Sequence, residues 1–245
     1  MAAPLLVLDF DGVVVDALTE CALVTWLGVH PPDPRRPVSA NTAAMPPAFV
    51  ERFGLVRAYS RILDHFLVAH RPAAGRMRTP ADFDRIFASL PGQYVAGFVA
   101  AATAARRRCR TEEPDVWLDL HTIYPGMPGL LARHAGAVAV VTAKDAGSVQ
   151  AILGRHGLDG AVLEIIGESR DKAAAVRALT ARHGTAPDRV TFVDDNLANV
   201  RQVAATGADA YWATWGYHTP ADRAEARRLR VRPLMLAAVP ALTTH

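Results

Sequence analysis

The segment Leu5-Leu6-Val7-Leu8-Asp9-Phe10-Asp11-Gly12, near the start of this 245-residue chain, determines how the remainder is interpreted. Four consecutive aliphatic residues are typical of a short strand that is buried on both faces of a parallel sheet. The run ends at two carboxylates and a glycine, which favour a turn. We therefore expect a buried first strand over residues 5–9 whose carboxyl end presents two acids.

Strands and helices alternate in the second half of the chain. We expect strands at 137–141, 162–166, 189–194 and 210–212, helices at 145–155, 171–182 and 197–205, and a final helix that is capped by Thr219. Such alternation predicts an α/β domain with a doubly wound parallel sheet.

Residues 17–120 interrupt this alternation, because they carry helical patterns and no convincing strand. The apolar stretch from Tyr94 to Ala105 predicts a buried helix, since a membrane span needs about 20 such residues. We expect a sheet domain formed by residues 1–16 and 121–245, with an all-helical domain of residues 17–120 inserted into it.

Composition defines the broad class of protein. With 51% hydrophobic and 21% charged residues, the chain has ample material for a packed core. A net charge of +3 gives little attraction to nucleic acid or to anionic membranes. Cys21 and Cys109 are too few for a disulfide framework, and we expect no export leader. We expect a cytoplasmic protein, a monomer or homodimer, without nucleic-acid or membrane partners.

Polar residues gather where the predicted strands end. They are Asp9 and Asp11 after the first strand, Thr142 and Lys144 after the second, Lys172 after the third, and Asp194 and Asp195 after the fourth. Ligands of open parallel sheets bind at this edge. Clustered carboxylates require a cation, and oxygen ligands favour a hard ion such as Mg²⁺. Hydroxyl and ammonium groups beside that ion suit a phosphoryl group.

Lysine usage independently singles out two of these positions. The chain has 27 basic residues, and all of them are arginines except Lys144 and Lys172. A compact ammonium can concentrate its charge on a carboxylate or phosphate where the planar guanidinium is too bulky. The two lysines therefore mark candidate site positions.

The ordered motifs resemble the haloacid dehalogenase superfamily, in its phosphatase branch. The matching residues are Asp9-Phe10-Asp11-Gly12-Val13, then Thr142, then Lys172, then Val193-Asp194-Asp195 with Asn199. The resemblance covers residues 1–16 and 121–235 and implies a Rossmann-like core. Residues 17–120 stand at the position of the family's helical cap.

The resemblance also implies residue roles. Asp9 is expected to be the nucleophile, Asp11 the general acid/base, and Lys172 the partner of the nucleophile and phosphate. The phosphoryl oxygens would be bound by Thr142, Ala143 and Lys144.

For Mg²⁺, the resemblance implies the Asp9 side chain, the Asp11 carbonyl and an acid of the fourth motif. Asp195 is favoured as the direct ligand because it stands four residues before Asn199, with Asp194 in direct or water-mediated contact. Gly12 and Asn199 would support the site.

The implied activity is Mg²⁺-dependent hydrolysis of a small phosphorylated metabolite through an aspartyl-phosphate. A phosphosugar mutase on the same core, or a non-catalytic binding protein, are the alternatives. A phosphonate-cleaving enzyme of this family would need a lysine of the cap to form a Schiff base. It is disfavoured because residues 17–120 contain no lysine. Relatives often have Gly-Asp in place of Asp194-Asp195 and Asp in place of Asn199, which leaves the subfamily open.

Two further features are interpreted as structural. Arg106-Arg107-Arg108 is read as solvated surface in preference to a substrate-binding face. Trp212 and Trp215, near Gly216-Tyr217, are read as packing residues.

Overall fold

The computed structural model describes residues 3–31, 37–42 and 44–244, and the chain divides into two compact units. The first, called the sheet unit, comprises Met1–Asp16 and Thr122–His245; the second, called the helical unit, comprises Ala17–His121. The chain leaves the sheet unit after β2 (Val15–Asp16) and returns at β3 (Thr122–Ile123). These two short strands pair antiparallel, with Asp16 opposite Thr122.

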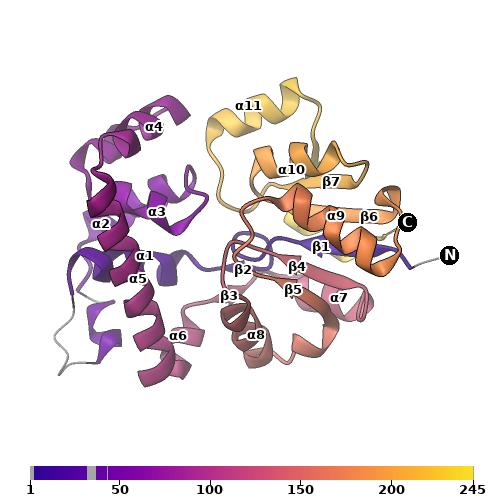
Figure 1. Cartoon of the computed structure of the whole chain (residues 1–245), viewed down its shortest axis with the longest axis horizontal. Helices are drawn as coiled ribbons and strands as arrows, with labels where there is room; N and C mark the ends of the chain where they lie inside the picture. The colour runs from indigo at the N-terminus through magenta and orange to yellow at the C-terminus, as the bar shows by residue number, and fades with distance from the viewer. Residues whose placement is uncertain (1–2, 32–36, 43, 245) are drawn as a thin grey trace. The chain divides into compact units, whose positions relative to one another are not determined.

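The sheet unit contains a six-stranded sheet whose neighbouring strands are all parallel. Its members are β1 (Leu5–Leu8), β4 (Val138–Val141), β5 (Val162–Ile166), β6 (Val190–Asp194), β7 (Asp209–Ala213) and β8 (Arg232–Leu234), in the spatial order β5-β4-β1-β6-β7-β8 (Figure 1). Successive strands are added on one side of β1 and then on the other. The order therefore reverses beside β1, and this reversal is where doubly wound sheets bind their ligands.

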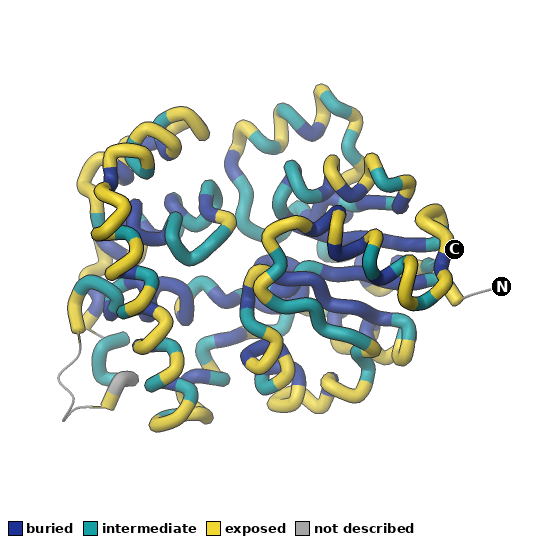
Figure 2. The backbone as a smooth tube through the Cα atoms, viewed as in Figure 1, coloured by how far each residue is buried: buried dark blue, intermediate teal, exposed yellow. Residues whose placement is uncertain are grey.

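The central strands have no solvated face. Every residue of β1, β4 and β6 is buried, which explains the uninterrupted aliphatic sequences of β1 and β4 (Figure 2). One face of the sheet packs against residues of α9 (Lys172–His183), α10 (Leu197–Ala204) and α11 (Pro220–Arg228). The fold class predicted from the alternating pattern is confirmed.

Side-chain caps set the starts of several helices. The Asp145 carboxylate accepts from the Ser148 amide at the start of α8 (Ala146–Arg155), and Asp171 caps α9 in the same way. Thr219 and Asp222 form a reciprocal capping box at α11. The unit also contains α7 (Met127–Arg133) and the 3-10 turns η4 (Asp159–Ala161), η5 (Pro187–Arg189) and η6 (Leu236–Ala241).

The helical unit has no strand among its described residues. Its elements are α1 (Leu18–Val29), η1 (Val38–Asn41), α2 (Pro47–Arg57), α3 (Leu63–Phe66), η2 (Leu67–His70), η3 (Pro72–Arg76), α4 (Pro80–Ala88), α5 (Gly92–Glu112) and α6 (Pro114–Asp119). The expectation of a buried helix at 94–105 is only partly correct. Helix α5 buries one face, including Phe98 and Ala102, while Tyr94 is 44% exposed.

Three strands were not predicted from the sequence. Strands β2 and β3 have two residues each, and β8 contains Pro233, which removes an amide donor and suits a sheet edge. In the described part of the chain, no single helix has the length and apolarity to cross a membrane. One pair, α4 and α5, passes only jointly, with a 99° bend between them.

Candidate active site

Asp9 lies at the point where the strand order reverses. It directly follows β1, the strand between β4 and β6, and its amide donates to the Val193 carbonyl at 2.9 Å. This bond joins the first motif to the end of β6, where Asp194 and Asp195 stand.

Three carboxylates converge there. One oxygen from each of Asp9, Asp194 and Asp195 lies within 4.8 Å of the others. The Asp194 side chain is fully buried and Asp195 is nearly so. Carboxylates at this separation repel one another in a low-dielectric setting, so their cluster is suited to bind a cation.

Lys172 is the first residue of α9, the helix that follows β5, and its side chain reaches this cluster. Its ammonium lies 2.7 Å from Asp9 Oδ1 and 3.8 Å from Asp194 Oδ2, and it also donates to the Val141 carbonyl. Burial alone would lower the pKa of Lys172, but the charges of Asp9 and Asp194 outweigh it and raise this pKa. The lysine therefore stays cationic beside the predicted nucleophile.

Asp194 is held by the start of α10. Its Oδ1 accepts from the Asn196 amide at 2.7 Å, and its Oδ2 accepts from Asn199 Nδ2 at 3.0 Å. Burial and the charge of Asp9 nevertheless raise the pKa of Asp194, against the opposing effects of Lys172 and these hydrogen bonds. A carboxyl that is this hard to ionise is one that a bound cation would stabilise in its charged form.

The partner of Asn199 differs from the one that its spacing predicted. The amide binds Asp194, five residues earlier, in place of Asp195. The two acids are consecutive at the end of a strand, where successive side chains point to opposite sides. Helix α10 begins on the side of Asp194, and Asp195 turns toward the segment after β7.

Asp195 contacts both β7 and the segment after it. Its Oδ2 accepts from the Tyr217 amide at 2.6 Å, and its carbonyl accepts from Trp212 Nε1 at 2.8 Å. The interpretation of Trp212 as a packing residue is therefore incomplete, because its indole also bonds to the fourth motif. No simple pattern in the sequence marks these contacts, which join residues 17 and 22 positions apart.

Gly12 makes the close approach of Asp195 possible. Its φ is +92°, and a Cβ added there would lie 2.2 Å from Asp195 Oδ2. Any larger residue would therefore be strained and would collide with the carboxylate.

Asp11 pairs with Lys144 across the site. The Lys144 ammonium lies 3.1 Å from Asp11 Oδ2, while Asp11 Oδ1 is buried and makes no hydrogen bond within the described chain. An unsatisfied buried oxygen is costly in an ordinary fold and is typical of a group that acts on a ligand. The sequence had assigned Lys144 to the phosphate; the structure shows its contact with Asp11.

Thr142 and Ala143 follow β4 directly. Thr142 is buried, its hydroxyl oxygen accepts from the Lys144 amide at 3.2 Å, and its amide donates to Ile166 at 2.9 Å. Ala143 is exposed. The Val141 carbonyl that binds Lys172 is the neighbour of Thr142, so this turn lies beside the ammonium that contacts Asp9.

The acids fit Mg²⁺ or a similar hard cation. Three carboxylates offer oxygen ligands within one small volume, and the Lys172 ammonium supplies one positive charge against them. The Asp9 and Asp195 side chains, with Asp194, are the residues that would hold such an ion.

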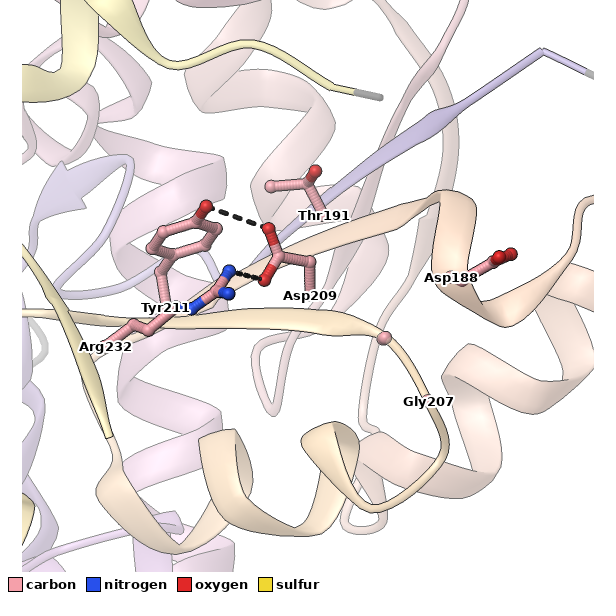
Figure 3. A pocket seen from close by; sticks show the side chains of 7 residues that line it. Asp188, Thr191, Gly207, Asp209, Tyr211 and Arg232 are labelled. Carbon is pink, nitrogen blue, oxygen red and sulfur yellow. Dashed lines mark hydrogen bonds and ion pairs between the residues drawn. The ribbon is translucent and has the colours of Figure 1, made fainter. Parts of the chain in front are cut away.

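A separate cavity of about 450 Å³ lies at the amino-terminal ends of the strands, opposite the acidic cluster. It is lined by residues at the starts of β6, β7 and β8, including Thr191, Asp209 and Arg232 (Figure 3). Asp209 accepts from Tyr211 Oη at 2.8 Å and pairs with Arg232. The pairing of Asp209 with Arg232 distinguishes this cavity from the acidic cluster at the carboxyl ends, where three carboxylates meet.

The arginine run of the helical unit is not uniformly solvated as expected. Arg106 Nε lies 2.7 Å from Glu20 Oε1, and Arg106 binds Oε2 as well. Glu20 is fully buried, and Trp117 Nε1 also donates to it at 3.3 Å. Arg106 therefore completes a buried ion pair inside the helical unit.

The chain is similar to known proteins in structure, but it matches none of them by sequence family. No family model matches the sequence, and no curated protein matches it. Among solved structures, one described as a predicted phosphoglycolate phosphatase from Haemophilus somnus is 18% identical, with a TM-score of 0.63, and covers 97% of this chain and 96% of its own. A haloacid dehalogenase-like hydrolase from Streptococcus pneumoniae is 15% identical, with a TM-score of 0.60, and covers 98% and 97%.

A haloacid dehalogenase-like protein from Agrobacterium tumefaciens is similar to the same extent, at 16% identity and a TM-score of 0.58, covering 98% and 97%. At such low identity these likenesses establish the fold. The chain has the haloacid dehalogenase-like fold, and its helical unit is inserted in sequence between the two parts of the sheet unit.

Proposed function

We propose that the protein is a Mg²⁺-dependent phosphomonoesterase that acts on a small phosphorylated metabolite, with the helical unit as its cap. One observation carries the proposal: Asp9, Asp194, Asp195 and Lys172, from three separate segments, meet at the carboxyl end of β1. The similarity to solved haloacid dehalogenase-like hydrolases supports it.

In this mechanism, a carboxylate oxygen of Asp9 attacks phosphorus, and the bond from phosphorus to the ester oxygen breaks. Lys172 holds Asp9 through Oδ1 and keeps a positive charge beside it. An aspartyl-phosphate forms, and water then attacks its phosphorus and releases inorganic phosphate and the Asp9 carboxylate.

Asp11 moves the proton in both halves of the reaction. Its Oδ1 gives a proton to the departing alkoxide and later takes one from the attacking water. Lys144 orients Asp11 by holding the other oxygen, Oδ2. Thr142, with the exposed turn at Ala143, would donate to the phosphoryl oxygens.

Asp9, Asp195 and Asp194, with the Asp11 carbonyl, would hold the Mg²⁺ ion. When bound, Mg²⁺ neutralises the charge of the phosphoryl group and of the clustered carboxylates. The raised pKa of Asp194 fits this role, because burial beside Asp9 leaves its charged form short of compensation.

The test is phosphate release from a substrate panel that includes phosphoglycolate, sugar phosphates and nucleotides. Phosphoglycolate belongs in it because a structural neighbour's description names that substrate. We expect release that stops with EDTA and returns with added Mg²⁺. Release that is indifferent to the chelator would contradict the proposal, and isomerisation of a sugar phosphate without release would indicate a mutase.

A further inference from the structure

The stretch from Trp212, near the end of β7, to Tyr217 bonds to the segments that follow β1 and β6. It contacts Asp195 through Trp212 Nε1 and the Tyr217 amide, at 2.8 and 2.6 Å. Trp215 Nε1 donates to the Val13 carbonyl at 3.2 Å. The Tyr217 hydroxyl lies 2.7 Å from Asp16 Oδ1. These residues therefore link Asp195 of the fourth motif to residues 13–16, which follow the first motif.

We propose that Tyr217 is a positioning residue for Asp195, whose amide fixes the carboxylate while its hydroxyl is anchored on Asp16 of β2. The inference rests on the proposed function for its catalytic consequence. Its structural basis lies entirely in the sheet unit.

The contact with Asp195 is strong and directional. An amide that donates to a carboxylate makes a charge-assisted hydrogen bond, and 2.6 Å is at the short end of its range. Because this bond occupies Oδ2, it restrains rotation of the carboxylate and thereby fixes where the other oxygen, Oδ1, lies. The position of Asp195 toward a metal ion thus depends on where the backbone of residue 217 lies.

Two glycines allow the backbone to approach this closely. A Cβ on Gly216 would lie 2.4 Å from both Asp195 Cβ and the Gly12 carbonyl oxygen. A Cβ on Gly12 would lie 2.9 Å from the Tyr217 ring, besides its collision with Asp195. Three segments, around residues 12, 195 and 216, are therefore packed without spare room, and a shift of one must move the others.

Asp16 gives the anchor a particular place in the fold. It is the last residue of the sheet unit before the chain enters the helical unit, and it pairs with Thr122 where the chain returns. A displacement of β2 can therefore reach Asp195 through the phenol of Tyr217.

The experiment compares two tyrosines that each donate to an aspartate. Tyr217→Phe removes the bond to Asp16 and keeps the ring and the amide. Tyr211→Phe, the matched control, removes the 2.8 Å bond to Asp209 at the other end of the sheet (Figure 3). Mg²⁺ binding without substrate is measured by calorimetry and by the fluorescence of the tryptophans, and kcat and KM are then measured at saturating Mg²⁺.

We expect Tyr217→Phe to weaken Mg²⁺ binding by about five- to thirtyfold, because part of the free energy of the hydrogen bond to Asp16 is lost from the positioning of Asp195. The variant should lower kcat more than it raises KM. Tyr211→Phe should change Mg²⁺ affinity by less than about twofold. Equal behaviour of the two variants would overturn the proposal.

A second pair at Asp16 tests the anchor from its other side. Asp16→Asn keeps the Oδ1 acceptor and should retain Mg²⁺ affinity, whereas Asp16→Ala should repeat the loss seen in Tyr217→Phe. Failure of Asp16→Ala to weaken binding would overturn the proposal, even if Tyr217→Phe does not fold. If the wild type binds Mg²⁺ with these differences but releases no phosphate, the proposed function fails and the positioning role stands.

Discussion

Each unit of the protein contains a fully buried carboxylate, and the two are treated oppositely. Glu20 of the helical unit and Asp194 of the sheet unit both have 0% exposed area. Glu20 meets a bidentate Arg106 and the indole of Trp117. Asp194 has hydrogen bonds too, but it lies within 4.8 Å of oxygens from two other acids, Asp9 and Asp195.

The difference separates a charge that stabilises a fold from one that serves a ligand. A buried ion pair with complete partners is costly to break but needs nothing further. A cluster of like charges is unfavourable until a cation or substrate joins it, and folded proteins retain such local conflicts mainly at functional sites. Removing a charge should therefore harm stability in the helical unit and activity in the sheet unit.

The largest expected effect is that of Asp9→Asn. It removes the attacking charge, so phosphate release should fall by at least about 10³-fold. It also removes a charge that repels Asp194 but pairs with Lys172, so the shift of the thermal unfolding midpoint in EDTA compares the relieved repulsion with the lost ion pair. Activity near the wild-type level would show that Asp9 is not the nucleophile. A higher midpoint would show that repulsion between the acids outweighs the ion pair with Lys172, and a lower one the reverse.

Glu20→Gln tests the other half of the comparison. Arg106 would lose its counter-charge, and the free energy of unfolding should fall by about 2 to 4 kcal/mol in urea titrations. Turnover of the folded protein should be little changed. The control is Glu112→Gln, which breaks the exposed pair with Arg108 and should cost less than about 1 kcal/mol. Equal costs for both variants would remove the distinction between the pairs.

Lys172→Arg tests whether the ammonium is needed, or only its charge. The guanidinium is too large for the space between Asp9, Asp194 and the Val141 carbonyl, so kcat should fall by about 10²-fold. Arg182→Lys on the same helix, where the arginine side chain is 47% exposed, is the matched exchange and should leave kcat unchanged. Near-normal turnover in Lys172→Arg would mean that charge alone suffices.

His70 predicts a pH effect on stability that belongs to the helical unit. Burial lowers its pKa from 6.5 to about 4, although the Thr25 carbonyl accepts from its Nε2. The unfolded chain binds the proton first as the pH falls, so stability is lost between about pH 6.5 and pH 4, by about 2 kcal/mol on going from pH 7 to pH 5.

Urea unfolding at these two pH values checks the effect. His70→Gln keeps a donor for Thr25 but does not titrate, so its stability should depend less on pH. His156→Gln, at an exposed position, is the matched histidine exchange for comparison. An unchanged dependence in His70→Gln would assign the loss to other groups.

The sheet was predictable to the extent that its signals are local. Continuous aliphatic runs identified β1 and β4, because strands that are buried on both faces have no polar alternation. The largely apolar segments of β5 and β6, which are interrupted by Glu164 and Thr191, were predicted as strands as well. Strand β8 was missed because three residues that include Pro233 carry no such signal. The helix starts at Asp145 and Asp171 were found because a cap acts within three residues.

For the site, the sequence supplied the residues and their common edge. Parallel strands place their carboxyl ends together, so the sequence alone groups Asp9, Lys172 and the acids at the end of β6. The sequence did not reveal that Asn199 binds Asp194, that Lys144 binds Asp11, or that Tyr217 holds Asp195. Those pairings depend on side-chain direction at the strand ends.

By itself, then, the sequence determined the alternating α/β core, the inserted helical region and the set of acidic and lysine side chains at one edge. Only the tertiary structure decided the partners, such as Tyr217 with Asp16, 201 residues apart, and Arg106 with Glu20, 86 apart. Hydrophobic periodicity and caps act over a few residues, and the chain records them directly. Distances between remote side chains arise from packing, because several segments must fill one volume together.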